Sequence, residues 1–294
     1  MAEDEALRKS APVSWTTRPC TPADAETLLG LAQLHDVEEF GAVQADLSDI
    51  EQFLNSDAQV WMALDEVPVG FAHVHPNGEC DSFVDPSYDR ALQPALIEEI
   101  IARGRALDLT TLQHWSGPDE RLTVPALKPF GFHHANTTWS LRHDLSDLTE
   151  AVWPPGVVLT PFDRERDGRE VWTLVSDAFR SVGLSRDRPF EEWARLSLTD
   201  ANVHCARRDG ELIGCATHTI HLGVGYVRQL AVAESERGRG LGRALLLHTL
   251  RHDLARGLAA TTLNVDGRNE NARRLYDSVG MVVTQEYSRW DLAL

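Results

Sequence analysis

The chain has 294 residues, 43% of them hydrophobic, which suffices for one large or two ordinary domains with a sizeable core. Its formal net charge of −17 argues against nucleic acid as a partner, because that binding needs clustered lysine and arginine. No apolar run approaches the ~20 residues that cross a bilayer, and the N-terminal residues lack the apolar core of a signal peptide. We therefore expect a cytoplasmic protein without a membrane partner, preceded by a disordered tail over residues 1–15.

The first half of the chain predicts alternating strands and helices. Thr21 and Pro22 are typical of a helix start, as N-cap and first helical residue. Hydrophobic spacing places the other elements in the following order. We expect a strand and a helix within 17–35, a helix at 47–54, strands at 60–64, 69–75 and up to 84, a helix at 94–107, a strand at 110–115, a short helix at 122–130 and a strand at 133–141.

Residues 157–294 repeat this order. The elements expected there are helices at 170–179 and 189–196, strands at 203–207, 212–221 and 226–233, a helix from about 241, a strand at 260–265, a helix from about 269 and a strand at 282–292. Gly131 and Phe132 fall on Gly280 and Met281, 149 residues later. The repeat predicts an internal duplication with domains at 16–146 and 147–294, joined by a Trp-Pro-Pro-Gly linker. One large α/β domain is the alternative.

A glycine-rich turn separates the strand at 226–233 from the helix that follows. It contains three arginines and three glycines: Arg237, Gly238, Arg239, Gly240, Gly242 and Arg243. The first amides of a helix have no partner within it and lie at its positive end. A turn without side chains lets a phosphate approach them, so this segment predicts a pyrophosphate site. A solvated loop is the alternative, since the spacing fits neither a P-loop nor the dinucleotide fingerprint.

The spacing Arg237-x-x-Gly240-x-Gly242 resembles the acyl-CoA loop of the GNAT N-acetyltransferase superfamily. Residues 269–281, NENARRLYDSVGM, resemble that family's Asn-x-x-Ala-x-x-Leu-Tyr-x-x-x-Gly-Phe helix, with Met281 in place of Phe. The resemblance covers about the last third of the chain in detail. It implies an α/β (α+β) fold of two tandem GNAT-like domains, each a mixed, mostly antiparallel, splayed central sheet flanked by helices. The tandem layout resembles that of two-domain members of the family.

The resemblance also implies the co-substrate acetyl-CoA and a small-molecule amine as acceptor. The residues that it places against acetyl-CoA are Leu230, Ala231, Val232, Arg237, Gly238, Arg239, Gly240, Leu241, Gly242, Arg243, Asn264, Asn271, Arg274 and Tyr276. A backbone amide near Leu230 would polarise the thioester carbonyl. The amine would then attack directly in a ternary complex, so the enzyme would act mainly by positioning its two substrates.

Tyr276 takes the family position of the general acid that protonates the departing CoA thiolate. A tyrosine that only packs at a helix end is the alternative. The sequence does not identify the general base. Tyr226 stands where several family members carry a glutamate, and the other candidates are His218, His221, Glu191, Glu192 and a relaying water.

The first half lacks the features of the second. Ala91 and Gln93 stand where the second half has Gly240 and Gly242, and Leu127 stands where it has Tyr276. We therefore expect the first domain to be degenerate for CoA.

The cysteines and histidines predict no further site. The four cysteines have neither zinc nor disulfide spacing. The pairs His73/His75 and His133/His134 lack companion ligands, so we expect no metal. A homodimer is left open. The functional alternatives are transfer of a longer acyl group and a non-catalytic acyl-CoA-binding or regulatory module.

Overall fold

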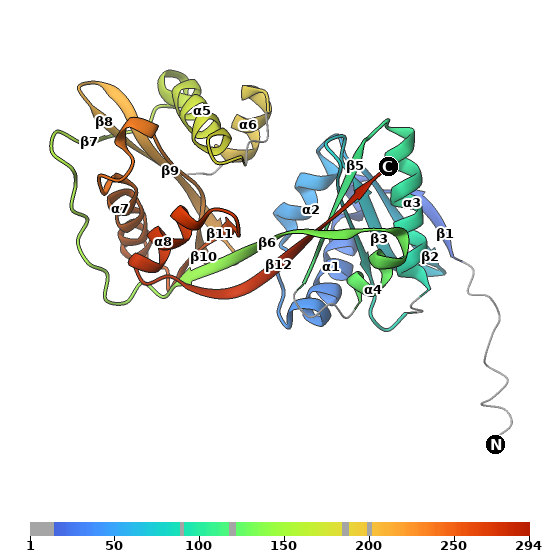
Figure 1. Ribbon diagram of the computed structural model, residues 1–294. Coiled ribbons are helices and arrows are strands. Elements are labelled where there is room, and N and C mark those ends of the chain that lie inside the picture. Colours follow the sequence, from blue (N-terminus) through green and yellow to red (C-terminus); the bar gives the residue numbers. More distant parts are fainter. Residues whose placement is uncertain (1–14, 89–90, 118–121, 184–187, 199–201) are drawn as a thin grey trace, which may run out of the picture. The chain divides into compact units, whose positions relative to one another are not determined.

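The chain forms two compact units. The computed structural model describes residues 15–88, 91–117, 122–183, 188–198 and 202–294 (Figure 1). Unit 1 comprises Met1–Thr137 and Glu286–Leu294, and unit 2 comprises Thr138–Gln285. Residues 1–14 of the predicted tail lie outside the described residues, whereas Trp15 packs, partly buried, against the core of unit 1.

The sheet of unit 1 is antiparallel except where β4 and β5 pair in parallel. Its strand order is β1 (Thr16–Pro19), β2 (Gln59–Asp65), β3 (Val67–Val74), β4 (Glu79–Val84), β5 (Thr111–Ser116), β12 (Val282–Ala293) and β6 (His133–His143), the last two sharing their residues with unit 2. The helical segments are η1 (Pro22–Asp24), α1 (Ala25–Phe40), α2 (Leu47–Leu54), α3 (Leu92–Ala106), α4 (Thr123–Leu127) and η2 (Lys128–Phe130). One core contains the apolar side of α3 and another contains that of α1 and α2, so helices cover both faces of the sheet.

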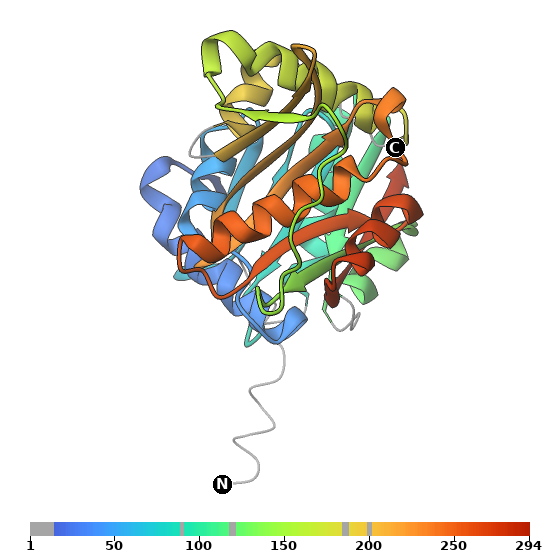
Figure 2. The same ribbon diagram turned by 90° about the vertical axis from the view of Figure 1, so that its left-hand side faces the viewer.

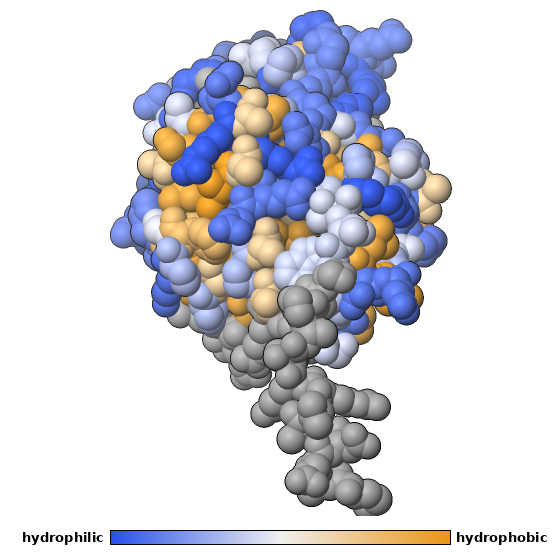
Figure 3. All heavy atoms as spheres, turned by 90° about the vertical axis from the view of Figure 1, so that its right-hand side faces the viewer, coloured by the Kyte–Doolittle hydropathy of each residue, from blue (hydrophilic) through white to orange (hydrophobic). Residues whose placement is uncertain are grey.

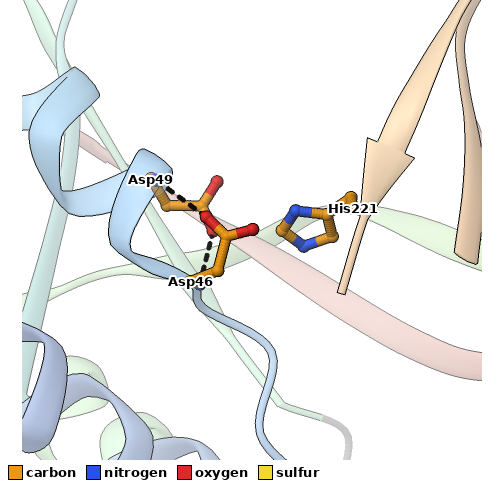
Figure 4. Close-up of side chains that lie close together, drawn as sticks. All are labelled: Asp46, Asp49 and His221. Carbon is orange, nitrogen blue, oxygen red and sulfur yellow. Dashed lines mark hydrogen bonds between the residues drawn. The ribbon is translucent and has the colours of Figure 1, made fainter. Parts of the chain in front are cut away.

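A reciprocal pair of carboxylates starts α2 (Figure 4). The Asp46 side chain accepts hydrogen bonds from the backbone amides of Ser48 and Asp49, at 2.8 and 3.3 Å. The Asp49 carboxylate in turn accepts from the backbone amide of Asp46 at 2.9 Å. This capping box satisfies amides that would otherwise have no partner at the helix start.

Unit 2 has the same arrangement. Its strand order is β7 (Val158–Thr160), β8 (Asn202–Arg208), β9 (Glu211–His221), β10 (Val224–Val232), β11 (Thr261–Asp266), β6 and β12. Its helical segments are α5 (Arg164–Arg180), α6 (Phe190–Ser197), η3 (Glu234–Glu236), α7 (Leu241–Ala255) and α8 (Glu270–Ser278). Figure 2 shows α7, in orange, lying across the strands. The core under α7 and α8 is separate from the one under α5 and α6.

The duplication predicted from the sequence is confirmed at the level of single elements. Helices α3 and α7 begin and end 149 residues apart. Gly131 and Gly280, also 149 residues apart, have left-handed φ angles of 90° and 89°. The two units do not meet at residue 146, the domain boundary expected from the sequence. Strands β6 and β12 each contribute residues to both units. In unit 1 the neighbour of β5 is β12, whereas in unit 2 the neighbour of β11 is β6.

The parallel strand pair of each unit separates along its length. In unit 2, β10 pairs with β11 over Gly225–Val227, and this strand pairing ends before the second half of β10. In unit 1, β4 pairs with β5 only at Glu79 and Cys80. A central sheet that is splayed in both units agrees with the fold class expected from the sequence.

Side chains occupy part of the opening in unit 1, and a smaller cavity of about 170 Å³ remains beyond them, lined by the end of β4, the start of α3 and α4. The Ser82 hydroxyl lies 2.9 Å from Nε2 of His114 and accepts a hydrogen bond from the Gln93 amide at 3.0 Å. All three residues are buried. A fully bonded polar network of this kind resists displacement because its members would otherwise be buried without partners.

Hydrophilic and hydrophobic residues are unevenly distributed on the one face drawn in Figure 3. On the face shown in Figure 3, hydrophilic residues cover most of the area and hydrophobic residues form separate smaller patches. Within the described ranges, no helix is long and apolar enough to span a membrane.

Leu141→Ala tests the contribution of β6 to unit 2. Leu141 lies opposite Leu263 of β11, is fully buried, and packs in the core under α7. We expect the substitution to lower the free energy of unfolding by about 2–5 kcal/mol, since it removes buried methyl groups and leaves a cavity. Urea unfolding measures the effect. Leu254→Ala is the control, because Leu254 on α7 is 47% exposed, and equal losses in the two variants would contradict the assignment.

Candidate active site

A cavity of about 640 Å³ lies in unit 2, lined by β10, the start of α7, β11 and α8. Most of the residues predicted to contact acetyl-CoA line it, namely Leu230, Val232, Arg237, Gly238, Gly240, Leu241, Gly242, Arg243, Asn264, Asn271, Arg274 and Tyr276. Two are not among the lining residues. Ala231 is buried in the core, and Arg239 lies 3.7 Å from the Glu236 carboxylate. The structure therefore brings the two sequence motifs together around one space.

Backbone conformation explains two of the glycines in the turn. Gly238 and Gly240 have φ angles of 74° and 85°, in the left-handed region that favours glycine. A Cβ at either position would meet no atom within 4 Å, so the space beside them is open. At Gly242, by contrast, a Cβ would lie 3.3 Å from Leu275 of α8, so this glycine allows close packing.

The start of α7 presents free backbone amides to the cavity. Gly240 is the N-cap and has no side chain to cap the helix, and the amide of Ala244 bonds its carbonyl at 3.0 Å. The amides of Leu241, Gly242 and Arg243 precede this bond and so have no partner within the helix. They lie at the positive end of the helix dipole, which favours a bound anion.

Charge in the cavity has the opposite sign to that of the whole chain. Its lining contains four arginines, Arg228, Arg237, Arg243 and Arg274. The two acidic lining residues are both paired, Glu236 with Arg208 and Asp266 with Arg268. A positive site in a chain of net charge −17 indicates an anionic ligand.

Arg237, the first residue of the motif, holds the turn in place. Its guanidinium donates to the Ser181 hydroxyl at 2.9 Å and to the Val232 carbonyl at 3.2 Å. These bonds join the turn to the end of α5 and to β10. Arg274 donates to the Asn271 side chain and keeps 67% of its own side chain exposed, so it is better placed to meet a ligand from solution.

Tyr276 reaches the cavity from α8. Its residue is 9% exposed and its ring belongs to the core under α7, while the residue also lines the cavity. Burial raises the pKa of Tyr276 to about 12. A neutral phenol at the edge of a cavity can donate a proton or a hydrogen bond to a ligand.

The other candidate catalytic residues are not among the residues that line the cavity. His218 is fully buried and lies 3.0 Å from Nε2 of His204. Glu192 of α6 lies 3.5 Å from Arg188. Tyr226 lies in the paired part of β10, where its hydroxyl accepts a hydrogen bond from Asn264 at 3.4 Å.

Several lining residues have no signature in the sequence. Val227 pairs with His218 and Gln229 pairs with Thr217, so Arg228 is an extra residue that forms a β-bulge. The bulge places Arg228 and Gln229 at the cavity, where the end of α5 contributes Ala178, Phe179 and Val182. No local pattern signals a bulge, because it depends on how two strands pair.

Comparison with known proteins identifies the family. The model of the acetyltransferase (GNAT) family matches residues 168–281. A mycothiol acetyltransferase of Thermomonospora curvata is 32% identical over 74% of this chain and 76% of its own length. Another mycothiol acetyltransferase, of Thermobispora bispora, is 28% identical over 92% of this chain and 94% of its own length. This chain belongs to the GNAT acetyltransferase family.

Solved structures agree with the tandem fold of this acetyltransferase. A GCN5-related N-acetyltransferase of Sphaerobacter thermophilus has a TM-score of 0.77 at 21% identity, covering 97% of both chains. A tandem GNAT protein from the clavulanic acid biosynthesis pathway also has a TM-score of 0.77, at 17% identity, covering 95% of this chain and 98% of its own. At these identities the likeness concerns the fold.

Proposed function

We propose that the protein transfers the acetyl group of acetyl-CoA to a primary amine of a small molecule, and that the cavity of unit 2 is the active site. The observation that carries this proposal is that free helix amides, arginines and a protonated tyrosine surround one cavity. The amides of residues 241–243 and the exposed Arg274 suit phosphate groups. Acetyl-CoA supplies an activated thioester, whose carbonyl an amide of β10 near Leu230 would polarise.

The amine attacks the thioester directly in a ternary complex. The lining contains no serine, cysteine or lysine among the described residues, so it offers no usual nucleophile for a covalent intermediate. Tyr276 donates its proton to the departing thiolate. The carboxylates of Glu236 and Asp266 are already paired with arginines, so the proton of the amine passes to water.

The relatives are mycothiol acetyltransferases, but this does not by itself identify the acceptor amine of this chain. Tyr226 stands where several family members carry a glutamate, so the residue by which the resemblance would assign a general base is missing here. We propose an amine of a natural product or antibiotic as an equal candidate.

Unit 1 is proposed to be degenerate for CoA. Ser82, His114 and Gln93 occupy part of its opening, which leaves a cavity of only about 170 Å³. Leu127, which stands in place of Tyr276, is fully buried. The proposed catalytic domain is unit 2, Thr138–Gln285, in place of the expected 147–294, and six residues of β6 pair with β11 in its sheet.

A panel of amines tests the function. Purified protein is incubated with acetyl-CoA and single amines, including amino sugars and the amino-thiol conjugate of mycothiol synthesis, and free CoA thiol and acetylated product are measured. Product with at least one amine, absent with Gly240→Glu protein, is expected. Transfer only from longer acyl-CoAs would favour the longer-chain alternative, and CoA binding without turnover on any amine would favour the non-catalytic module.

The pH dependence of turnover follows from the raised pKa of Tyr276. A general acid loses activity as the pH rises through its pKa, and burial places that pKa at about 12. We therefore expect kcat to show no alkaline decline between pH 7 and about pH 10, where a solvent-exposed tyrosine would begin to ionise. Steady-state rates at saturating substrates measure this, and a decline centred below pH 9 would contradict Tyr276 as the acid.

A further inference from the structure

Four histidines of unit 2 lie together at the inner side of α7, and none of them lines the cavity. His204 comes from β8, His218 from β9, and His248 and His252 from α7, one helical turn apart. The ring of His204 lies 4.8 Å from that of His218, 4.5 Å from that of His248 and 5.1 Å from that of His252. Such a grouping brings several imidazole nitrogens into one small volume.

One pair of nitrogens already has a spacing that suits a shared cation, while the His252 nitrogen lies farther away. Nε2 of His204 lies 3.0 Å from Nε2 of His218. Two imidazoles on one tetrahedral Zn²⁺ have coordinating nitrogens about 3.3 Å apart, given Zn–N bonds of about 2.0 Å. The ring of His252 is 5.1 Å from that of His218, and its buried Nε2 has no hydrogen-bond partner among the described residues.

A carboxylate stands behind His218, on the side away from His204. Oδ1 of Asp253 lies 3.2 Å from Nδ1 of His218, and both side chains are fully buried. The Thr261 hydroxyl donates to the other Asp253 oxygen at 2.8 Å. Oδ1 of Asp253 and Nδ1 of His218 lie within ion-pair distance but do not form a hydrogen bond. Metal-binding histidines commonly donate the N–H of their second ring nitrogen to a carboxylate in such a position.

Three of the rings are accessible from solution. His204, His248 and His252 are partly exposed. Strand β7 pairs with β8 over Cys205–Arg207, so this edge strand ends before it reaches His204. Histidine binds a metal through the lone pair of a neutral imidazole.

We propose that His204, His218 and His252 bind one Zn²⁺ ion, with His248 or a water as the fourth ligand. Imidazole is a preferred ligand of zinc and related divalent ions. Binding includes one side-chain movement, in which the His252 ring turns until its free Nε2 faces the other two nitrogens. The bound ion joins α7 to β8 and β9 and so stabilises unit 2.

Cobalt titration tests the site, because Zn²⁺ has a filled d shell without visible absorption. Tag-free, chelator-treated protein is titrated with Co²⁺ and then with Zn²⁺. We expect tetrahedral-type visible absorption that saturates at one equivalent per chain, displacement by Zn²⁺, and a higher melting temperature with Zn²⁺.

Matched variants locate the binding. His252→Ala is expected to weaken Co²⁺ binding at least tenfold, since even the loss of a residue that only orients a ligand costs about 10–100-fold in metal affinity. His134→Ala, which removes an exposed histidine of unit 1, should leave it unchanged. Thermal unfolding without metal checks that the variants fold, and His204→Gln replaces His252→Ala if the latter does not. Octahedral-type spectra, binding below one equivalent, or undiminished binding in the α7 or β8 variant would overturn the proposal.

Discussion

Gly240→Glu is expected to weaken acetyl-CoA binding at least about a hundredfold, which corresponds to about 2.8 kcal/mol. Two effects of the substitution act together. Gly240 has a φ of 85°, which other residues adopt only with strain, and its new carboxylate would stand at the amides proposed to hold phosphate. Like charges brought together at a binding site cost several kcal/mol. Calorimetric titration with acetyl-CoA measures the change.

The far end of the same helix supplies a matched control. Gly257 follows α7, has a φ of 81°, and a Cβ added there would likewise meet no atom within 4 Å. Gly257→Glu therefore adds the same charge and a similar backbone strain, without approaching the cavity. Equal loss of affinity in both variants would mean that strain or net charge, rather than the turn, causes the effect.

Tyr276→Phe is expected to lower kcat by about 10²–10⁴ while leaving the affinity for acetyl-CoA within a few-fold of wild type. The ring packs in the core under α7, and phenylalanine keeps that packing. The phenol has no hydrogen-bond partner among the described residues that its loss would disturb. The substitution thus removes the proposed proton donor with little structural change. Steady-state kinetics and calorimetry together separate the two quantities.

Tyr287→Phe serves as the control for that variant. Tyr287 belongs to unit 1, where its hydroxyl donates to the Gln44 side chain at 3.0 Å. Normal turnover is expected there. An unchanged kcat in Tyr276→Phe would show that the thiolate leaves without help from this residue, and a large rise in the dissociation constant would make Tyr276 a binding residue instead.

Local patterns predict the elements of the site well. The strand, the glycine turn and α7 follow one another within 32 residues, from Val224 to Ala255, so their order alone determines their contact. The duplication is readable because Gly131 and Gly280 keep the same spacing and the same left-handed conformation.

Features that depend on pairing between distant segments are not readable in the same way. No local pattern indicates that β12 joins unit 1 or that β6 completes unit 2, because either strand satisfies the same hydrophobic pattern. The histidine cluster escapes prediction for the same reason. Only His248 and His252 have a recognisable spacing, on one face of a helix, while His204 and His218 meet them through the sheet.

The stoichiometry of acetyl-CoA binding to the wild-type protein tests the central claim most directly. We expect one site per chain in a calorimetric titration, because the cavity of unit 2 is about 640 Å³ and carries four arginines, whereas that of unit 1 is about 170 Å³ and is lined by neither arginine nor lysine among the described residues. Two sites would contradict the proposed degeneracy of unit 1. No binding to the folded protein would contradict the assignment of the unit 2 cavity to acetyl-CoA.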